Sequence, residues 1–205
     1  MKIGETIKIG SYYQSNDITK EPIEWIVLEI KEDTALIISK YILDFKSFHS
    51  TSGSRTWSCC DVRKWLNTEF EEIIFSESER KLIKVNKTIT NDLLFDKCGF
   101  IDDYSDDQED EYEEEIFDEC SDKMFLLSTD EANKYFKSDD ERKGFPTPFA
   151  STNGATPNEP CWWLLRSLAY ERILVSYVNS SGYVNRSGAF MSRPEGIRPA
   201  MWISI

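Results

Sequence analysis

The C-terminal part of the chain is a series of short apolar runs that turn-forming residues separate. After residue 161 the runs WWLLRS, ILVSYV, SGYVN, GAFMS and IRPAMWISI follow one another, split by Gly, Ser and Asn. Runs of this length and spacing predict short β-strands joined by tight turns, which excludes an all-helical fold. The near-repeat of YVNSSG and YVNRSG in residues 177–188 predicts a hairpin with its turn at residues 179–182, because Asn, Ser and Gly favour turns.

The N-terminal part predicts a second hairpin, over residues 22–39, with its turn at residues 31–33. Apolar residues occupy both alternating sets of positions from Ile23 to Ile30. A strand that is apolar on both faces is typical of a strand buried on both sides, and we expect that burial here.

Helices are expected between these two β-rich parts. Each expected helix follows a serine with an acidic residue three positions later, as in a capping box. These pairs are Ser58 with Asp61, Ser76 with Glu79, and Ser128 with Glu131. After the first pair, apolar residues recur at the spacing of one helical face, at Val62, Trp65, Leu66 and Phe70.

Residues 142–161 contain four prolines and two glycines and predict a long ordered loop. The order of hairpin, helices, loop and strands predicts an α+β fold. At 205 residues the chain is long enough to bury a sizeable core, and we expect one domain over residues 1–205.

The whole charge imbalance of the chain lies in residues 102–122. This segment holds 13 acidic and no basic residues, and the rest of the chain is balanced at 24 of each. A neutral body lacks the basic face that nucleic-acid binding needs, so direct binding to nucleic acid is not expected. Carboxylates at this density repel one another, so we expect an insertion that does not pack into the core.

Three roles are open for the acidic insertion: a solvated loop, a calcium site, or a surface for a basic protein partner. In the last role the chain would be an acidic effector, such as a phage-encoded inhibitor or a mimic of nucleic acid that acts on a DNA-binding protein. The spacing of an EF-hand loop is absent. Tyr104 and Tyr112 interleave the acids, as in a segment that folds against a partner. The candidate partner-binding residues lie at its centre and are Asp106, Asp107, Glu109, Asp110, Glu111 and Tyr112.

A second candidate surface lies on the C-terminal hairpins, which are rich in Tyr and Asn, as binding loops are. The candidate ligand-binding residues there are Tyr177, Asn179, Tyr183, Asn185 and Arg186. The alternative is that the asparagines only build turns.

Two arginines lie beside tryptophans in WWLLRS and GIRPAMW. In a strand, Trp162 and Trp163 face opposite sides, and Arg166 shares the side of Trp162. One interpretation is an arginine pair that clamps an anionic ligand. The other, which we favour, is that the arginines are buried, bond to backbone carbonyls and stack on tryptophan. The residues with this structural role are Trp162, Trp163, Arg166, Arg198 and Trp202.

Ordered motifs along nearly the whole chain resemble a bacterial domain family of unknown function, abundant in gut and clostridial bacteria and their phages. The motifs include EPIEW at 21–25, RKWLN at 63–67, FLLS at 125–128, WWLLRS at 162–167 and GIRPAMW at 196–202. The C-terminal half resembles the C-type-lectin-like fold of formylglycine-generating enzymes and of the variable proteins of diversity-generating retroelements. The resemblance implies a lectin-like binding module. The extra leucine in WWLLRS and the acidic insertion depart from the family pattern.

Catalysis is not expected from these residues. The single histidine, His49, lies in a loop where we expect it to face solvent, and no nearby residue marks a nucleophile. The lectin-like enzymes use a cysteine pair or several metal-binding histidines, whereas only Cys161 lies near the C-terminus. We therefore expect no metal and no cofactor.

The location is expected to be cytoplasmic. The five cysteines are scattered and form no Cys-x-x-Cys motif, as in a reduced protein. No apolar run approaches the length of a membrane span, and the first residues lack the pattern of a signal peptide. A protein partner is expected, and no membrane.

Overall fold

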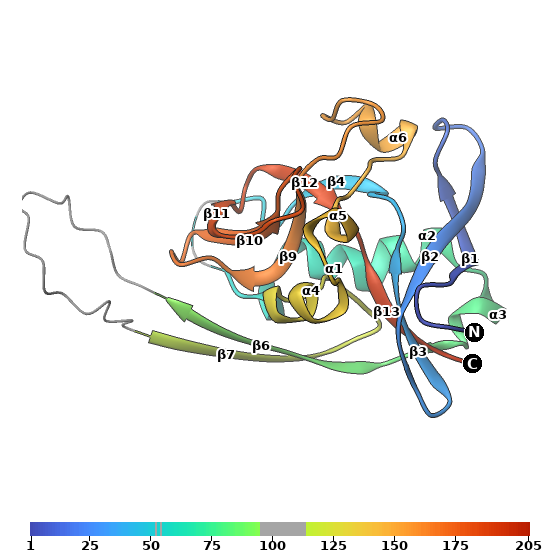
Figure 1. Cartoon of the computed structure of the whole chain (residues 1–205), viewed down its shortest axis with the longest axis horizontal. Helices are drawn as coiled ribbons and strands as arrows, with labels where there is room; N and C mark the ends of the chain where they lie inside the picture. Colours follow the sequence, from blue (N-terminus) through green and yellow to red (C-terminus); the bar gives the residue numbers. More distant parts are fainter. Residues whose placement is uncertain (52, 54, 95–113) are drawn as a thin grey trace, which may run out of the picture.

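The body of the protein contains two β-sheets, and a separate two-stranded arm lies along one side of it (Figure 1). This computed structural model describes residues 1–51, 53, 55–94 and 114–205. The first sheet has the order β1-β2-β3-β13-β5, with β8 also pairing with β13. Its strands are β1 (Thr6–Tyr13), β2 (Lys20–Lys31), β3 (Thr34–Ser39), β5 (Ile83–Lys84), β8 (Met124–Phe125) and β13 (Ala200–Ser204).

The second sheet has the order β11-β10-β9-β12-β4. Its strands are β4 (Asp44–Ser47), β9 (Trp163–Leu168), β10 (Leu174–Val178), β11 (Val184–Phe190) and β12 (Pro194–Ile197). With the short helices, these sheets make the α+β fold that the sequence predicts.

Two of the places where the chain passes from one sheet to the other are neighbours, from β3 to β4 and from β12 to β13. The Ser39 N–H donates to the Pro199 carbonyl at 2.9 Å, and the Leu43 N–H donates to the Ile197 carbonyl at 3.0 Å. These bonds hold the two crossings together. The N-terminal hairpin therefore shares a sheet with the last strand, and both termini lie at the same end of the molecule (Figure 1).

The predicted N-terminal hairpin is present, with Glu32 in its turn at a φ of 48°. Trp25 is fully buried on one face of β2. Ile26, on the other face, is only half-buried, so the prediction of burial on both sides is wrong at this position. The reason is that Glu24 lies beside it and forms exposed ion pairs with Lys8 and Lys40.

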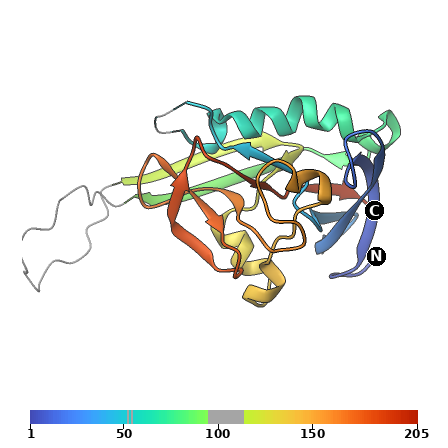
Figure 2. The same ribbon diagram turned by 90° about the horizontal axis from the view of Figure 1, so that it is seen from above.

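A helical run lies along one side of the body (Figure 2). It comprises the 3-10 turn η1 (Trp57–Cys59), α1 (Asp61–Trp65), the π-helical η2 (Leu66–Phe70) and α2 (Glu71–Ile74). The predicted apolar face is buried at Val62, Leu66 and Phe70 and half-buried at Trp65.

Two of the three predicted capping boxes are present, at the starts of α3 (Glu77–Arg80) and α4 (Thr129–Tyr135). The prediction for Ser58 is wrong, because Cys60 precedes α1 and makes no side-chain cap. The Asp61 carboxylate instead accepts hydrogen bonds from the N–H and the hydroxyl of Ser50, at 2.8 and 2.6 Å. Two further short helices, α5 (Asp139–Arg142) and α6 (Pro148–Ser151), precede and interrupt the predicted long loop.

The C-terminal hairpin between β10 and β11 turns where the sequence predicts. Gly182 ends that turn at a φ of 89°, and a Cβ atom there would lie 1.8 Å from the Asp139 carbonyl oxygen. Only glycine fits this position, both for its backbone conformation and for the close approach of α5.

The arm consists of β6 (Asn86–Leu94) and β7 (Glu114–Asp122), paired antiparallel from Asn86↔Asp122 to Leu94↔Glu114. The prediction that residues 102–122 do not pack is therefore wrong for residues 114–122. The alternation of a strand explains the difference: Glu115 and Glu119 face solvent, while Cys120 and Asp122 are buried. The apolar residues on either side of the acidic insertion predict ordered flanks. Met124–Leu127 are buried, whereas the flank at 95–101 lies outside the described residues.

Candidate functional site

The arm contacts the body mainly through polar side chains, although Ile116 and Cys120 of β7 also pack against the core. Thr88, Thr90 and Asp92 occupy alternate positions of β6, and all three are buried. On β7, Asp122 is only 1% exposed. Apolar side chains at such positions would each contribute about 1.5–3 kcal/mol by burial. A buried polar group costs free energy unless it forms a hydrogen bond. The hydrogen-bond partners of these side chains therefore determine how firmly the arm is attached to the body.

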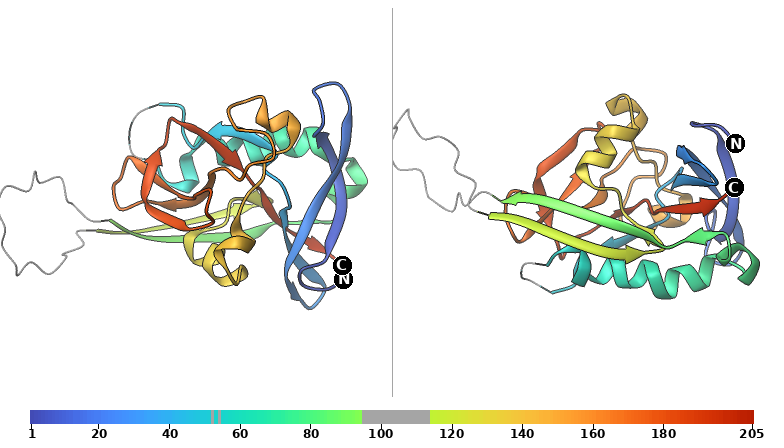
Figure 3. Two further views of the ribbon diagram at one scale, coloured as in Figure 1. Left: turned by 45° about the horizontal axis from the view of Figure 1, so that its top comes forward. Right: turned by 90° about the horizontal axis from the view of Figure 1, so that it is seen from below.

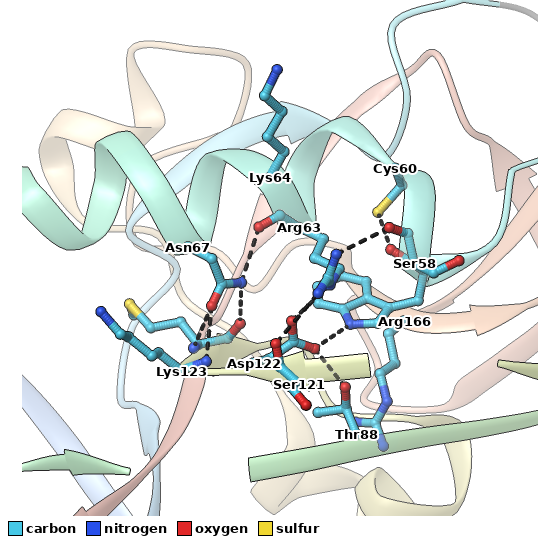
Figure 4. Close-up of polar contacts among 12 residues, drawn as sticks. Ser58, Cys60, Arg63, Lys64, Asn67, Thr88, Ser121, Asp122, Lys123 and Arg166 are labelled. Atoms are coloured by element: carbon cyan, nitrogen blue, oxygen red, sulfur yellow. Dashed lines mark hydrogen bonds and ion pairs between the residues drawn. The ribbon is translucent and has the colours of Figure 1, made fainter. Parts of the chain in front are cut away.

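The Asp122 carboxylate has three donors from three different elements (Figure 4). The Trp57 indole N–H and the Thr88 hydroxyl donate to its Oδ2, at 2.8 and 2.5 Å. The Arg63 Nε donates to its Oδ1 at 2.6 Å. We call these four residues the arm root. They join η1, α1, β6 and β7 through one buried carboxylate, and removing Asp122 takes this shared acceptor from Trp57, Arg63 and Thr88.

Arg166, which β9 carries into the interior, holds the middle of the arm. Its guanidinium is buried, as expected, and makes a two-bond contact with the Glu131 carboxylate. Because Glu131 is also the capping acid of α4, this arginine joins α4 to the arm. Its other acceptors are the Leu126 carbonyl at 2.8 Å, the Ile89 carbonyl at 3.0 Å and the Thr90 hydroxyl at 3.2 Å.

Asp92 makes the third contact between arm and body. Its Oδ2 accepts a hydrogen bond from the Leu168 N–H at 2.8 Å, whereas its buried Oδ1 has no protein partner. Burial raises the pKa of this carboxyl to about 6, although the Leu168 N–H and the charge of Arg186 oppose the shift. At neutral pH the arm therefore carries an ionised carboxylate that is incompletely paired.

A hollow of about 330 Å³ opens over the start of the helical run. Its polar lining is already used within the chain: Arg63 is bound to Asp122, and the Asn67 side chain is bonded to backbone groups of Lys123 and Met124. Lys64 points away from this network in Figure 4. The hollow is thus the outer side of the arm root and offers few free polar groups. Its lining residues are Ser58, Cys59, Cys60, Asp61, Arg63, Lys64, Asn67 and Thr68.

The residues predicted to bind a ligand on the C-terminal hairpins do not form one exposed surface. Tyr177 is buried, and its ring stacks on that of Trp162 with centroids 4.3 Å apart. The Asn179 Oδ1 accepts from the Ser181 and Tyr183 N–H groups, and Asn185 does the same for residues 187 and 188. Both asparagine side chains are therefore occupied in turns.

Two of these predicted ligand-binding residues remain accessible to a partner. Tyr183 is 58% exposed, and Arg186 lies with its guanidinium 5.2 Å from the Tyr170 ring centroid. Ligand binding by these two residues stays a prediction.

Arg198 lies buried where the chain crosses between the sheets. It donates to the carbonyls of Ser39 and Arg142, both at 3.2 Å, and its guanidinium lies 4.9 Å from the Trp163 ring centroid. Burial lowers its pKa to about 10. The expected arginine-on-tryptophan contact thus occurs here and not at Arg166, whose guanidinium lies over Phe125 because β8 lies closer. Trp202 is buried, with the Lys31 ammonium 5.0 Å from its ring.

The predicted partner-binding residues of the acidic insertion lie outside the described residues; they are Asp106, Asp107, Glu109, Asp110, Glu111 and Tyr112.

The expectation for His49 is wrong, because the side chain is buried. Its Nδ1 lies 3.2 Å from the Asp61 Oδ2, in the loop that folds back onto α1. The hydroxyl and N–H of Ser50, together with the charge of His49, hold the pKa of the Asp61 carboxyl below its usual range. This pairing brings together residues 12 positions apart in a loop that has no periodic pattern.

The described cysteines are free, at Cys59, Cys60, Cys120 and Cys161. Burial raises the pKa of the Cys60 thiol well above its usual range, that of Cys120 to about 11 and that of Cys161 to about 12. These three thiols stay protonated at neutral pH and are weak nucleophiles.

Metal binding has no obvious centre in the part of the chain that the structure describes, where no group of three or more His, Cys, Asp or Glu side chains could hold an ion. Among the same residues, no helix is both long and apolar enough to cross a membrane.

Comparison with known proteins gives one match. A family model described as a domain of unknown function, DUF6273, matches residues 32–205. This range begins in the turn between β2 and β3 and contains the second sheet and the arm. No curated protein and no solved structure matches the chain significantly.

Proposed function

The chain belongs to the DUF6273 family, and we propose that it is a non-enzymatic binding module that takes a basic protein partner on the outer face of its arm. One observation carries this proposal. The inner face of the arm lies against the body and is buried there. The outer face presents Phe117, which is 65% exposed, next to Ile89. The support for an interaction surface is that two exposed apolar side chains lie together here, with polar residues around them.

The chemistry of the outer face indicates the kind of partner. Ile89 lies opposite Glu119, and Asn91 lies opposite Phe117, so Ile89 and Phe117 are diagonal neighbours on one face. Glu115 and Glu119 flank this apolar pair on β7 and are exposed. Glu115 accepts a hydrogen bond from Asn91, and Glu119 forms an exposed ion pair with Lys87 that a basic partner would have to share. An apolar centre with carboxylates beside it complements a partner surface that combines an apolar residue with Lys or Arg.

The arm has the mechanical properties that such a surface needs. An isolated two-stranded hairpin is marginal in water. This one runs along the body in both views of Figure 3, and Asp122, Arg166 and Asp92 hold it at three places. A supported arm loses little conformational entropy when a partner binds.

The lectin-like character of the C-terminal half is part of the proposal. It is supported by the two motifs that carry the resemblance, since β9, which contains most of WWLLRS, is paired at Gly196↔Trp163 with β12, where GIRPAMW begins. A non-enzymatic role is supported by the burial of the single histidine and by the raised pKa of three thiols. The free cysteines support a cytoplasmic location.

A photo-crosslinking residue tests where the partner binds. Benzoylphenylalanine is placed at Phe117 in one variant and at Tyr183, which is equally accessible but on the C-terminal hairpin, in a matched control. We expect a specific crosslinked protein in native-host extract from position 117 only. Crosslinking from position 183 alone would move the working surface to the C-terminal hairpins.

Once the partner is identified, salt dependence tests its charge. We expect binding to weaken steeply between about 50 and 500 mM salt, because the attraction involves largely exposed carboxylates. A partner that binds equally well at both concentrations would contradict a basic partner. The alternative is an acidic effector, such as a phage-encoded inhibitor or a nucleic-acid mimic, that acts through the carboxylates of residues 102–122. It predicts that Phe117→Ser, which leaves every one of these acids in place, does not weaken binding.

A further inference from the structure

A second group of side chains, apart from the arm, meets at one corner of the second sheet. We call it the Trp162 corner; it comprises Cys161, Trp162, Tyr177, Arg193 and Glu195. The half-buried Trp162 ring stacks on Tyr177, with an angle of 21° between the rings. The Arg193 guanidinium lies 5.4 Å from the Trp162 ring centroid. Aromatic faces attract cations in this geometry.

Glu195 supplies a buried negative charge to the same corner. It lies on β12 and is only 6% exposed. Arg193 Nε lies 2.9 Å from its Oε1, yet that oxygen has no hydrogen bond, so the ion pair is close but misaligned. The opposite residue, Lys46 on β4, lies over the Trp65 ring and near Asp44. The carboxylate is therefore incompletely satisfied.

The neighbouring groups do not supply the missing positive charge. Burial is the main reason that the pKa of Glu195 is raised, and burial likewise raises the pKa of Tyr177 and of Cys161. Tyr177 and Cys161 are thus uncharged at neutral pH. Arg193 is the only cation that the structure assigns to this corner among the described residues, and its side chain is 63% exposed.

The arrangement is that of a cation site with a loosely held internal occupant. A buried carboxylate gains most from a guanidinium that donates two aligned hydrogen bonds, and an aromatic face beside it strengthens the contact. Arg193 provides the charge without the alignment and stays largely in water. If a better-aligned cation displaced Arg193, little binding free energy would be lost, because the existing ion pair is misaligned and exposed to water.

We propose that the Trp162 corner is a binding subsite for an arginine side chain of the partner, and that Arg193 is the internal side chain which the incoming guanidinium displaces. The inference deepens the proposed function, because it rests on a partner that is basic. It adds a second contact on a different sheet from the arm.

A pair of small probes tests the charge requirement directly on the full chain. The probes are the peptide acetyl-Gly-Arg-Gly-amide and its citrulline analogue, which keeps the shape and lacks the charge. Binding is followed by the NMR signal of the Trp162 indole N–H, assigned with Trp162→Phe. We expect the arginine peptide to shift this signal and to bind at least tenfold more tightly than the citrulline peptide. Equal binding of both peptides, or no shift, would overturn the proposal.

Two variants test the roles within the corner. Glu195→Gln should weaken binding of the arginine peptide about tenfold or more, since a desolvated charge pair contributes on the order of 1.4 kcal/mol or above. The control is Glu5→Gln, at an exposed glutamate. Arg193→Ala should tighten binding several-fold by vacating the site, whereas Lys8→Ala, with the same change of charge, should not. Failure of either expectation overturns the proposal, and Arg193→Ala decides it if Glu195→Gln does not fold.

The arm and the corner can fail separately. Phe117→Ser should leave binding of the arginine peptide unchanged, because the arm lies on another part of the molecule. If both peptides bind equally while crosslinking at position 117 succeeds, the corner is not an arginine subsite and the proposed function stands. If the arginine peptide is preferred but no crosslink forms at position 117, the arm is not the partner surface.

Discussion

The body and the arm of this protein are held by different kinds of contact. In the body, apolar side chains of both sheets and of the helical run pack in one core that includes Trp25, Trp57 and Trp163. The arm contributes threonines and aspartates to its contact with that body. Apolar packing is non-directional and tolerates small shifts, whereas a buried polar contact needs its own partner in place.

This difference indicates that the arm is a separable unit. Few apolar contacts attach it, and each polar contact can be removed alone by one substitution. Regions of low apolar contact open at lower free energy than the core around them. The arm can therefore open without unfolding the body, and the following substitutions test that separation.

The largest expected effect is from Arg166→Met. The change leaves Glu131, the Ile89 carbonyl and the Leu126 carbonyl without their buried donor. We expect a loss of about 3–5 kcal/mol in the free energy of unfolding, measured with urea. The control, Lys8→Met at an exposed lysine that removes the same charge, should change it by less than about 0.5 kcal/mol. Equal effects of both changes would contradict the structural role of Arg166.

Asp122→Ala comes next, because it removes the shared acceptor of the arm root. The Trp57 indole and the Arg63 guanidinium then lose their buried partner. We expect a loss of about 2–3 kcal/mol, measured in the same way. Glu119→Ala on the solvent side of β7 is the control, and the arm root would have no special role if the two changes cost the same.

Asp92→Asn should stabilise the protein at neutral pH. The folded-state pKa of about 6 lies above the ordinary value of 3.8. Above pH 6 the carboxylate is charged in both states and its burial opposes folding. As the pH falls from 6 towards 3.8 the folded state takes up the proton first, so stability from this group rises.

Asparagine keeps an acceptor for the Leu168 N–H without the charge. We therefore expect a gain of about 2 kcal/mol at pH 7.5 that disappears below pH 4, from thermal unfolding at a series of pH values. A gain that does not depend on pH, or a loss at pH 7.5, would show that ionised Asp92 is satisfied in the folded protein.

Phe117→Ser should have the smallest effect on stability, within about 0.5 kcal/mol, because the side chain is exposed. Its effect on partner binding should be far larger. Phe190→Ser, at a similarly exposed phenylalanine on β11, is the control. If both changes weaken partner binding equally, the outer face of the arm is not the specific binding surface.

Local patterns in the sequence predicted local structure. The capping boxes of α3 and α4, the apolar helical face at Val62, Leu66 and Phe70, and the turn at residues 179–182 each depend on residues a few positions apart. The wrong predictions depend on distant partners. Asp122 is buried because Trp57 and Arg63 reach it, from 65 and 59 positions away.

One local pattern in the sequence does predict the first strand of the arm, but the acidic composition of the neighbouring segment draws attention away from it. Thr88, Thr90 and Asp92 alternate with larger residues as in a strand with one polar inner face. The alternation alone does not say which face of the strand is buried. A run of acidic residues in the paired strand suggests that both faces of the hairpin are exposed to solvent. The partner that makes burial of those polar groups tolerable, Arg166, lies 76 positions from Thr90.

Hydrogen exchange, measured by mass spectrometry on the native chain and on Asp122→Asn, tests most directly whether the arm is a separable polar-docked unit. We predict that amides of Asn86–Asp92 and 115–122 exchange through an opening of lower free energy than those of β3 and β13. Asp122→Asn should accelerate exchange in the arm and leave that of β3 and β13 unchanged. Equal protection of arm and body, with both lost together in the variant, would contradict the account.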